Sequence, residues 1–119
     1  MFINFSNHPS AKWSMEQIKA AEIFGKIRDF SFPNVSPMAR AEEVKETAEK
    51  TANEILNMHP QAVLCQGEFT LAYAVISRLK ENNIKVVAAC CERKTETVTD
   101  GNDTIKKAIF RFAGFREYL

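Results

Sequence analysis

The sequence predicts an α/β fold: a small Rossmann-like or flavodoxin-like parallel sheet flanked by helices, with a C-terminal antiparallel hairpin. Three features of the chain lead to this prediction. Short apolar runs alternate with longer amphipathic segments, as in chains built from β-α-β units. The run at residues 84–91 is nearly continuous in apolar residues, which is typical of a parallel strand covered on both faces. Asp100-Gly101 then lies between two strand-like segments, which is a strong hairpin signal.

The first half of the chain is expected to contain two strands, at residues 2–6 and 26–32, and two helices. Ser14 and Gln17 match a capping box, so the first helix should begin there and end near Gly25. The second helix, at residues 39–58, has apolar residues spaced three or four apart and ends at His59-Pro60. Its expected inner face consists of Ala41, Val44, Ala48, Ala52 and Ile55.

The second half is expected to add a strand at residues 62–65, a helix from about Glu68 to Asn82, and a strand at residues 84–91. Two further strands form the hairpin, so the predicted order is β-α-β-α-β-α-β followed by β-β. A flavodoxin-like strand order, 2-1-3-4, would place the first and third strands side by side.

Composition limits the class of protein. With 119 residues, the chain is expected to form one domain, residues 1–119, and so small a domain would gain from pairing with a second copy. A formal net charge of +1 argues against a basic coat for long nucleic acids but leaves room for a local basic pocket. No long apolar run suggests a membrane span, and the N-terminus does not resemble a signal peptide.

The three cysteines lie in apolar runs and are expected to be reduced, as in a soluble cytoplasmic protein. No Cys/His spacing indicates structural zinc, and no metal or other cofactor is predicted. A dinucleotide fingerprint and a Walker A motif are both missing from the sequence.

A ligand site is expected where the strands of the open sheet end, at the switch in strand order. Three polar loops should meet there, at residues 6–9, 66–68 and 91–94. In the second loop, Gly67 would permit close approach of the backbone, and the free amides of residues 69–71 would favour an anion. Glu68 fits such a site least well, because its charge repels phosphate unless it accepts hydrogen bonds from a ribose or a base, or caps the helix. Alternatively, Gly67 makes a tight turn and Glu68 complements the helix dipole.

Other side chains near these loops could bind or act on a ligand. Ser6 and Asn7 could donate hydrogen bonds, and His8 could act as a general acid or a cation, although a loop histidine can be purely structural. The Arg93 guanidinium suits phosphate, but Arg93 and Lys94 could equally be a solvated strand end. In the tail, basic residues alternate with Phe110, Phe112 and Phe115, which indicates a strand with one buried face or a surface that stacks on bases.

The segments "INFSNHP", "CQGEFTLAYAVISRLKENNIKVVAACCERKTET" and "FRFAGFREY" together resemble small CRISPR-associated, CARF-like proteins of type III systems, of the stand-alone ring-nuclease type. The resemblance covers the first strand and most of residues 60–119. It implies a homodimeric CARF-like domain that binds a cyclic oligoadenylate. It further implies antiviral defence by cleavage of that second messenger, without metal, through in-line attack of a ribose 2′-hydroxyl.

The resemblance also implies roles for individual residues. His8, Arg93 and Lys94 would be catalytic, and the ligand would be bound by Ser6, Asn7, Gln66, Gly67, Glu68 and Thr70. Arg116 of the basic-aromatic tail is a further ligand-binding candidate from its residue type and position. Cys91 departs from the pattern, because a small hydroxyl residue is expected before the Glu-Arg pair. Two other functions stay open: a non-catalytic nucleotide sensor or sink, and an interaction subunit that uses the basic-aromatic tail.

Overall fold

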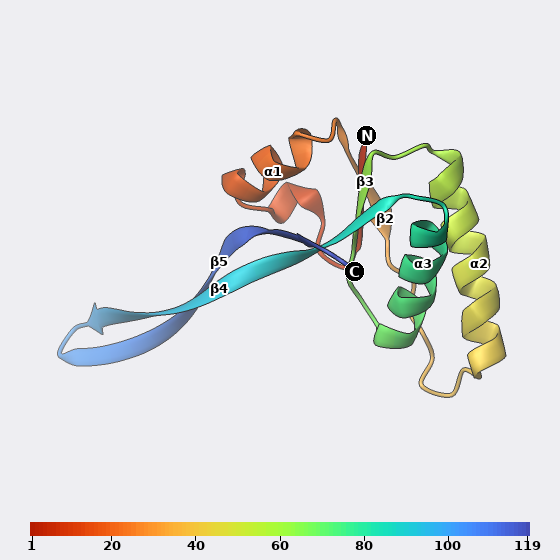
Figure 1. Ribbon diagram of the computed structural model, residues 1–119. Helices are drawn as coiled ribbons and strands as arrows, with labels where there is room; N and C mark the ends of the chain where they lie inside the picture. Colours follow the sequence, from red (N-terminus) through yellow and green to blue (C-terminus); the bar gives the residue numbers. More distant parts are fainter.

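The computed structural model describes residues 1–119 and contains one mixed sheet flanked by three α-helices (Figure 1). The strand order is β2-β1-β3-β4-β5, which confirms the predicted flavodoxin-like arrangement of the first four strands. The elements are β1 (Phe2–Ser6), η1 (Ser10–Lys12), α1 (Met15–Glu22), β2 (Ile27–Ser31), α2 (Ala41–Asn57), β3 (Ala62–Cys65), α3 (Phe69–Glu81), β4 (Lys85–Asp100) and β5 (Asp103–Glu117).

The parallel part of the sheet consists of β2, β1, β3 and the first residues of β4. Phe2 of β1 is in register with Ile27 of β2 and with Ala62 of β3, and Ala62 is in register with Lys85 of β4. Every residue of β1 and β3 is buried, as expected for central strands covered on both faces. The carboxyl ends of β1 and β3 therefore lie side by side.

The helices begin and end where local chemistry favours it. Ser14 caps α1 by accepting a hydrogen bond from the Gln17 amide, as the capping box predicted. At the end of α3, Asn83 adopts a left-handed conformation with φ of 61°, a role that asparagine tolerates well. On the inner face of α2, Ala48, Ala52 and Ile55 are buried. Ala41, also expected there, is exposed in the first turn.

Two hydrophobic clusters occupy the two faces of the sheet. The larger cluster joins the odd-numbered side chains of β1 and β3, such as Phe5 and Cys65, to α2 and α3. The smaller one joins the even-numbered side chains, such as Phe2 and Leu64, to α1 and to Phe115 of β5. This alternation follows from the two-residue repeat of a strand, and it decides which loop residues face which side.

The sequence prediction was wrong about β4, which does not end near residue 91. A single strand of 16 residues continues to Asp100, so the sheet has five strands rather than six. Val86 and Val87 are buried as expected, but from Cys91 onward the strand is exposed. Beyond Val87, β4 pairs only with β5, because no third strand reaches that far. The turn lies at Asp100-Gly101, as predicted, and Gly101 supplies a positive φ of 63°.

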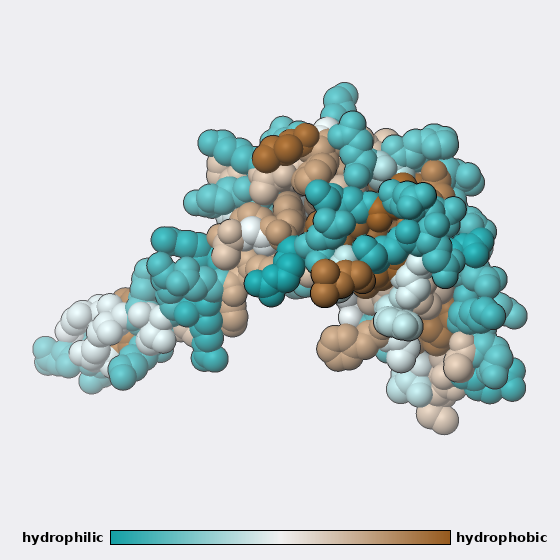
Figure 2. Space-filling model, in the orientation of Figure 1, coloured by the Kyte–Doolittle hydropathy of each residue, from teal (hydrophilic) through white to brown (hydrophobic).

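Residues 91–112 form a twisted two-stranded arm that projects from the body (Figure 1). The arm makes the molecule elongated, with extents of 56 × 38 × 25 Å. Its surface is largely hydrophilic to intermediate in hydropathy, whereas more hydrophobic residues gather on the body (Figure 2). None of the helices combines the length and apolar character needed to cross a membrane.

Candidate functional site

A cavity of about 530 Å³ lies on the α1 side of the sheet, at the carboxyl ends of β1 and β3. No carboxylate lines it. Its walls combine aromatic rings with amide, hydroxyl, imidazole and ammonium groups. The lining residues are Ser6, His8, Lys12, Trp13, Ser14, Gln17, Leu64, Gln66, Ala89, Cys91, Phe110 and Phe112.

Strand periodicity selects which side chains reach this cavity. Leu64 and Gln66 lie on the α1 side of the sheet, and Ala89 and Cys91 continue the same face on β4. The connection from β1 to α1 crosses above these residues, so Lys12 and Gln17 form the opposite wall. The first and third predicted loops thus meet the end of β3, but each contributes only some of its residues.

A buried hydrogen-bond network supports the loop that carries His8. Asn4, which is 1% exposed, donates through Nδ2 to the His8 carbonyl oxygen at 2.8 Å and to Asp29 Oδ1 at 2.9 Å. The Ser6 hydroxyl donates to Asn4 Oδ1 at 2.6 Å and accepts from the His8 amide at 3.2 Å. Because these polar groups are satisfied inside the protein, the loop is held in one shape and the His8 side chain is left exposed.

Trp13 links this loop to the aromatic wall. Its indole Nε1 donates to the His8 carbonyl oxygen at 3.1 Å, and its ring lies 6.5 Å from that of Phe115. A bulge in β5 makes the wall continuous. Cys90 pairs with Gly114 and Cys91 with Phe112, so Ala113 is the extra residue. The bulge turns Phe112 and Phe115 to the same side, with ring centroids 5.0 Å apart.

Gly67 faces the opposite side of the sheet from the cavity. A Cβ atom at this position would lie 2.5 Å from ring carbons of Phe32. The Phe32 ring is buried and stacks on Phe5 at 4.7 Å, so it has little room to move. Gly67 is therefore required by close packing of an aromatic side chain, and it does not line the cavity.

Glu68 caps α3. Its carboxylate accepts hydrogen bonds from the Thr70 amide at 3.0 Å and the Leu71 amide at 2.9 Å. The expectation that these two amides are free for an anion was wrong, because a side chain of the same turn already occupies them. The Thr70 hydroxyl also donates to the carboxylate, and these hydrogen bonds lower the pKa of Glu68. Glu68 and Thr70 are exposed, and neither lines the cavity.

Gln66 is the residue between β3 and α3 that lines the cavity. Its Oε1 accepts a hydrogen bond from the Ala89 amide at 2.6 Å, which ties the end of β3 to β4 beyond their last paired residues. This bond uses the acceptor of the side-chain amide. Its Nε2 group is left as the donor that Gln66 offers at the cavity it lines.

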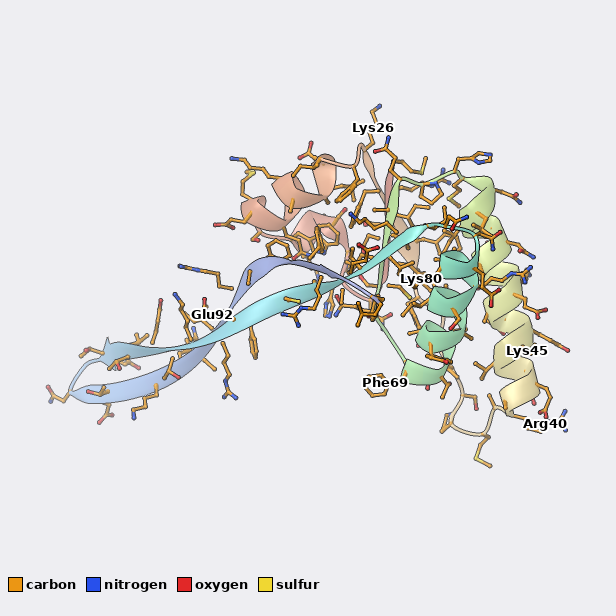
Figure 3. All side chains as sticks on the ribbon, in the orientation of Figure 1. Lys26, Arg40, Lys45, Phe69, Lys80 and Glu92 are labelled. Carbon is orange, nitrogen blue, oxygen red and sulfur yellow. The ribbon has the colours of Figure 1, made fainter.

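The predicted basic residues do not form one cluster. Arg93 pairs with Phe110 across the arm and lies on the same face as Cys91. Lys94 lies on the other face, where its Nζ is 3.8 Å from Glu92 Oε2. Arg116 follows Phe115, so it lies on the sheet face opposite the cavity. Figure 3 shows Glu92 on the arm, outside the body of the protein.

Asn7 lines a second, smaller cavity of about 180 Å³ between β1 and β2. Asp29 of β2 also lines it and accepts hydrogen bonds from the Ser10 amide at 3.2 and 3.3 Å. Ser6 reaches both cavities. The two predicted ligand-binding residues of this loop therefore point in partly different directions.

The three cysteines are free and differ in environment. Burial raises the pKa of the Cys65 thiol to about 12, so it is a structural group of the core. Burial, and then the nearby Cys65 and Cys90, raise the pKa of Tyr118, whose hydroxyl donates to the Cys65 carbonyl oxygen at 2.9 Å. Cys91 is exposed at the cavity. No three His, Cys, Asp or Glu side chains are grouped closely enough to hold a metal ion.

Sequence reasoning missed one whole wall of the cavity, from Lys12 to Gln17. The only tryptophan, Trp13, directly precedes the helix cap Ser14. A large aromatic residue in the connection that follows the first strand was the sequence feature that could have indicated this wall. Asn4 was also missed, although an amide inside an otherwise apolar strand requires a buried partner. The alternation of Phe110 and Phe112 with basic residues predicts a strand or a stacking surface, and the structure places both rings in the wall of the cavity.

Comparison with known families matches the sequence to the model of one family, described as "Uncharacterized protein MJ1673 family", over residues 1–116. The match includes every residue of the cavity and the whole arm. No curated protein matches the sequence.

Proposed function

The chain belongs to the uncharacterized protein MJ1673 family, and we propose that it binds a cyclic oligoadenylate in the cavity beside α1 and opens the ring. The observation that carries this proposal is the charge of the cavity. The chain has 15 acidic residues, yet none lines the cavity, where Lys12 and His8 supply positive or polar groups. A pocket without carboxylates favours a phosphate-containing ligand.

The aromatic wall supports a nucleotide over a simple anion. Trp13 and Phe112 offer ring faces on which a base can stack, and stacking is worth about 1–3 kcal/mol per base. Gln17 and the Nε2 group of Gln66 can donate hydrogen bonds to the edge of a base or to a ribose hydroxyl. The volume, about 530 Å³, falls within the range of small-molecule sites.

The proposed reaction depends mainly on holding the ribose 2′-hydroxyl in line with the adjacent phosphorus. The ribose 2′-oxygen bonds to the adjacent phosphorus while the bond from phosphorus to the 5′-oxygen breaks. The 2′-hydroxyl gives up its proton to a base, and the 5′-oxygen gains one, leaving a 2′,3′-cyclic phosphate and a 5′-hydroxyl. The His8 imidazole is the proposed proton carrier, and the Lys12 ammonium would stabilise charge on the phosphoryl oxygens.

Purified protein incubated with cyclic tetra- and hexa-adenylate tests this function. We expect linear products ending in a 2′,3′-cyclic phosphate, detected by chromatography and mass spectrometry, with EDTA present because the resemblance implies a metal-independent reaction. Loss of a general acid–base group typically costs 10²- to 10⁴-fold in rate, so His8→Asn should slow cleavage at least about 100-fold. His59→Asn is the matched control, since His59 is exposed at the far end of α2.

A second candidate is a non-catalytic sensor or sink for the same ligand. The Ser6 hydroxyl favours this candidate, because it already donates its hydrogen bond to Asn4. Few other groups are then left to take part in proton transfer with His8. Binding that raises the melting temperature, without turnover by the wild-type protein, would support this candidate and reject the enzyme. Failure of both rings to bind the folded protein would reject both candidates.

We also propose that two copies pair, and that the activity is cytoplasmic, as expected from the reduced cysteines. Support for pairing comes from the outer face of α3, where Phe69 is 88% exposed and Tyr73 is 75% exposed. Figure 3 shows the Phe69 side chain extending away from the start of α3. These rings border an apolar hollow of about 630 Å³ that also includes Leu119. Adjacent exposed rings of this kind mark interaction surfaces.

A further inference from the structure

The arm at residues 91–112 has two chemically different faces. Side chains alternate along each strand, and residues that pair across the strands share a face. The only register shift lies at Cys90/Cys91, so this alternation is unbroken from Cys91 to the turn. Cys91, Phe110 and Phe112 line the cavity, and their side of the ribbon is here called the cavity-side face.

The cavity-side face has no acidic residue. All the carboxylates of the arm lie on the other face, at Glu92, Glu96, Asp100 and Asp103. The cavity-side face instead carries Arg93 and Lys106, with threonines and Ala108 between them and the turn. Segregation of this kind leaves one side of the ribbon attractive to a polyanion.

Arg93 is the cation of this face nearest the cavity. It pairs directly with Phe110, one of the cavity-lining rings, and both side chains are exposed. A guanidinium beside an exposed ring can hold a phosphate while the ring stacks on the adjoining base. Lys106 lies farther toward the turn, where it pairs with Thr97.

We propose that the cavity-side face of the arm extends the ligand site, so that the bound molecule reaches beyond one nucleotide. One nucleotide occupies the cavity with its own phosphate beside Lys12, the following phosphodiester binds Arg93, and a second base stacks on Phe110. This inference rests on the proposed nucleotide function and adds to it the size of the ligand and the residues that read its length.

The test compares Arg93→Gln with Arg111→Gln. Both changes remove one exposed arginine from adjoining positions on the arm, but Arg111 pairs with Glu92 on the opposite face. Binding of AMP, of linear 5′-phosphorylated tri-adenylate and of cyclic tetra-adenylate is measured by calorimetry at several salt concentrations. A charged hydrogen bond to phosphate is worth about 10-fold or more in affinity.

We expect Arg93→Gln to weaken tri-adenylate and cyclic tetra-adenylate about 10-fold and to leave AMP unchanged. The slope of log affinity against log salt should fall by about 0.7, as for one single-stranded phosphate contact. Phe110→Ala should weaken the same two ligands about 10-fold through lost stacking. Arg111→Gln should bind all three like the wild type.

Two results would overturn the inference while leaving the proposed function intact: equal effects of Arg93→Gln and Arg111→Gln, or equal loss of AMP and oligoadenylate binding in Arg93→Gln. If the wild-type protein bound none of the adenylates, the proposed function and this extension of it would both be rejected.

Discussion

A single carboxylate, that of Glu68, decides what the start of α3 can bind. A helix N-terminus normally attracts anions because its first amides lack partners. Here Glu68 accepts hydrogen bonds from the amides of Thr70 and Leu71, so the chain supplies its own anion. The residue that looked least suited to a phosphate site is therefore the one that closes this end of the helix.

Replacing Glu68 tests that role through pH. Hydrogen bonds lower its pKa in the folded protein, so its contribution to stability is present above the carboxyl pKa of the unfolded chain and is lost as pH falls through the folded pKa. We expect Glu68→Gln to lower the melting temperature at pH 7 and the difference from wild type to shrink below pH 4.5, the ordinary pKa of the group. Thermal unfolding followed by circular dichroism from pH 7 to 3 measures both effects.

The same variant separates capping from ligand contact. If Glu68 held a ribose or a base, Glu68→Gln would reduce oligoadenylate affinity at pH 7 without lowering stability. If Glu68 only caps α3, affinity should stay within about twofold of the wild type, because the carboxylate does not line the cavity.

At the scale of elements, the residues that connect β3 to α3 face opposite sides of the sheet. Gln66 turns to the α1 side and lines the cavity, whereas Gly67 turns to the other side and packs under Phe32. Of these two adjacent residues, Gln66 therefore belongs to the site and Gly67 to the packed core. The alternation of side chains at a strand end is the physical cause.

Gly67→Ala should destabilise the fold by about 1–3 kcal/mol, the usual cost of forcing extra volume into a packed core. The new methyl would meet the Phe32 ring at 2.5 Å. Urea unfolding gives the free energies of the wild type, Gly67→Ala, Phe32→Leu and the double variant. We expect Gly67→Ala to cost much less when residue 32 is leucine, and an unchanged cost would contradict a clash with the ring.

At the scale of the whole molecule, the arm dominates the shape. The radius of gyration is 16.9 Å, compared with about 14 Å for a compact chain of this length. Only 22 of 119 residues are buried, and none of them lies in the arm at residues 91–112. The rings exposed on α3 lie on the body, on the side of the sheet away from the cavity.

If two copies pair through that face, the wild-type protein should elute as a dimer in size-exclusion chromatography with light scattering. Tyr73→Glu should produce a monomer, since it places a charge among the rings beside Phe69. Met38→Glu is the control, because Met38 is 85% exposed outside this hollow. A monomeric wild type, or a dimeric Tyr73→Glu protein, would contradict pairing through α3.

Much of the fold could be predicted from the sequence because its signals are local. The predicted strands at residues 2–6 and 62–65 match the structure, and Ser14 caps α1 as expected. Less of the site could be predicted. His8, Ser6 and Gln66 reach the cavity. The other predicted site residues do not line it: Asn7, Gly67, Glu68, Thr70, Arg93, Lys94 and Arg116.

By itself, the sequence determined the helices, the order of the elements up to β4 and the hairpin turn, since hydrophobic period, capping and turn chemistry act within a few neighbouring residues. It did not reveal that β4 continues as one strand to Asp100. Tertiary structure alone decided which side chains share the cavity. That choice depends on the face to which each strand turns its residues, on the crossover that brings Lys12 to Gln17 over the strand ends, and on the extra residue Ala113 in β5. These contacts join residues about 100 positions apart, where no local pattern can report them.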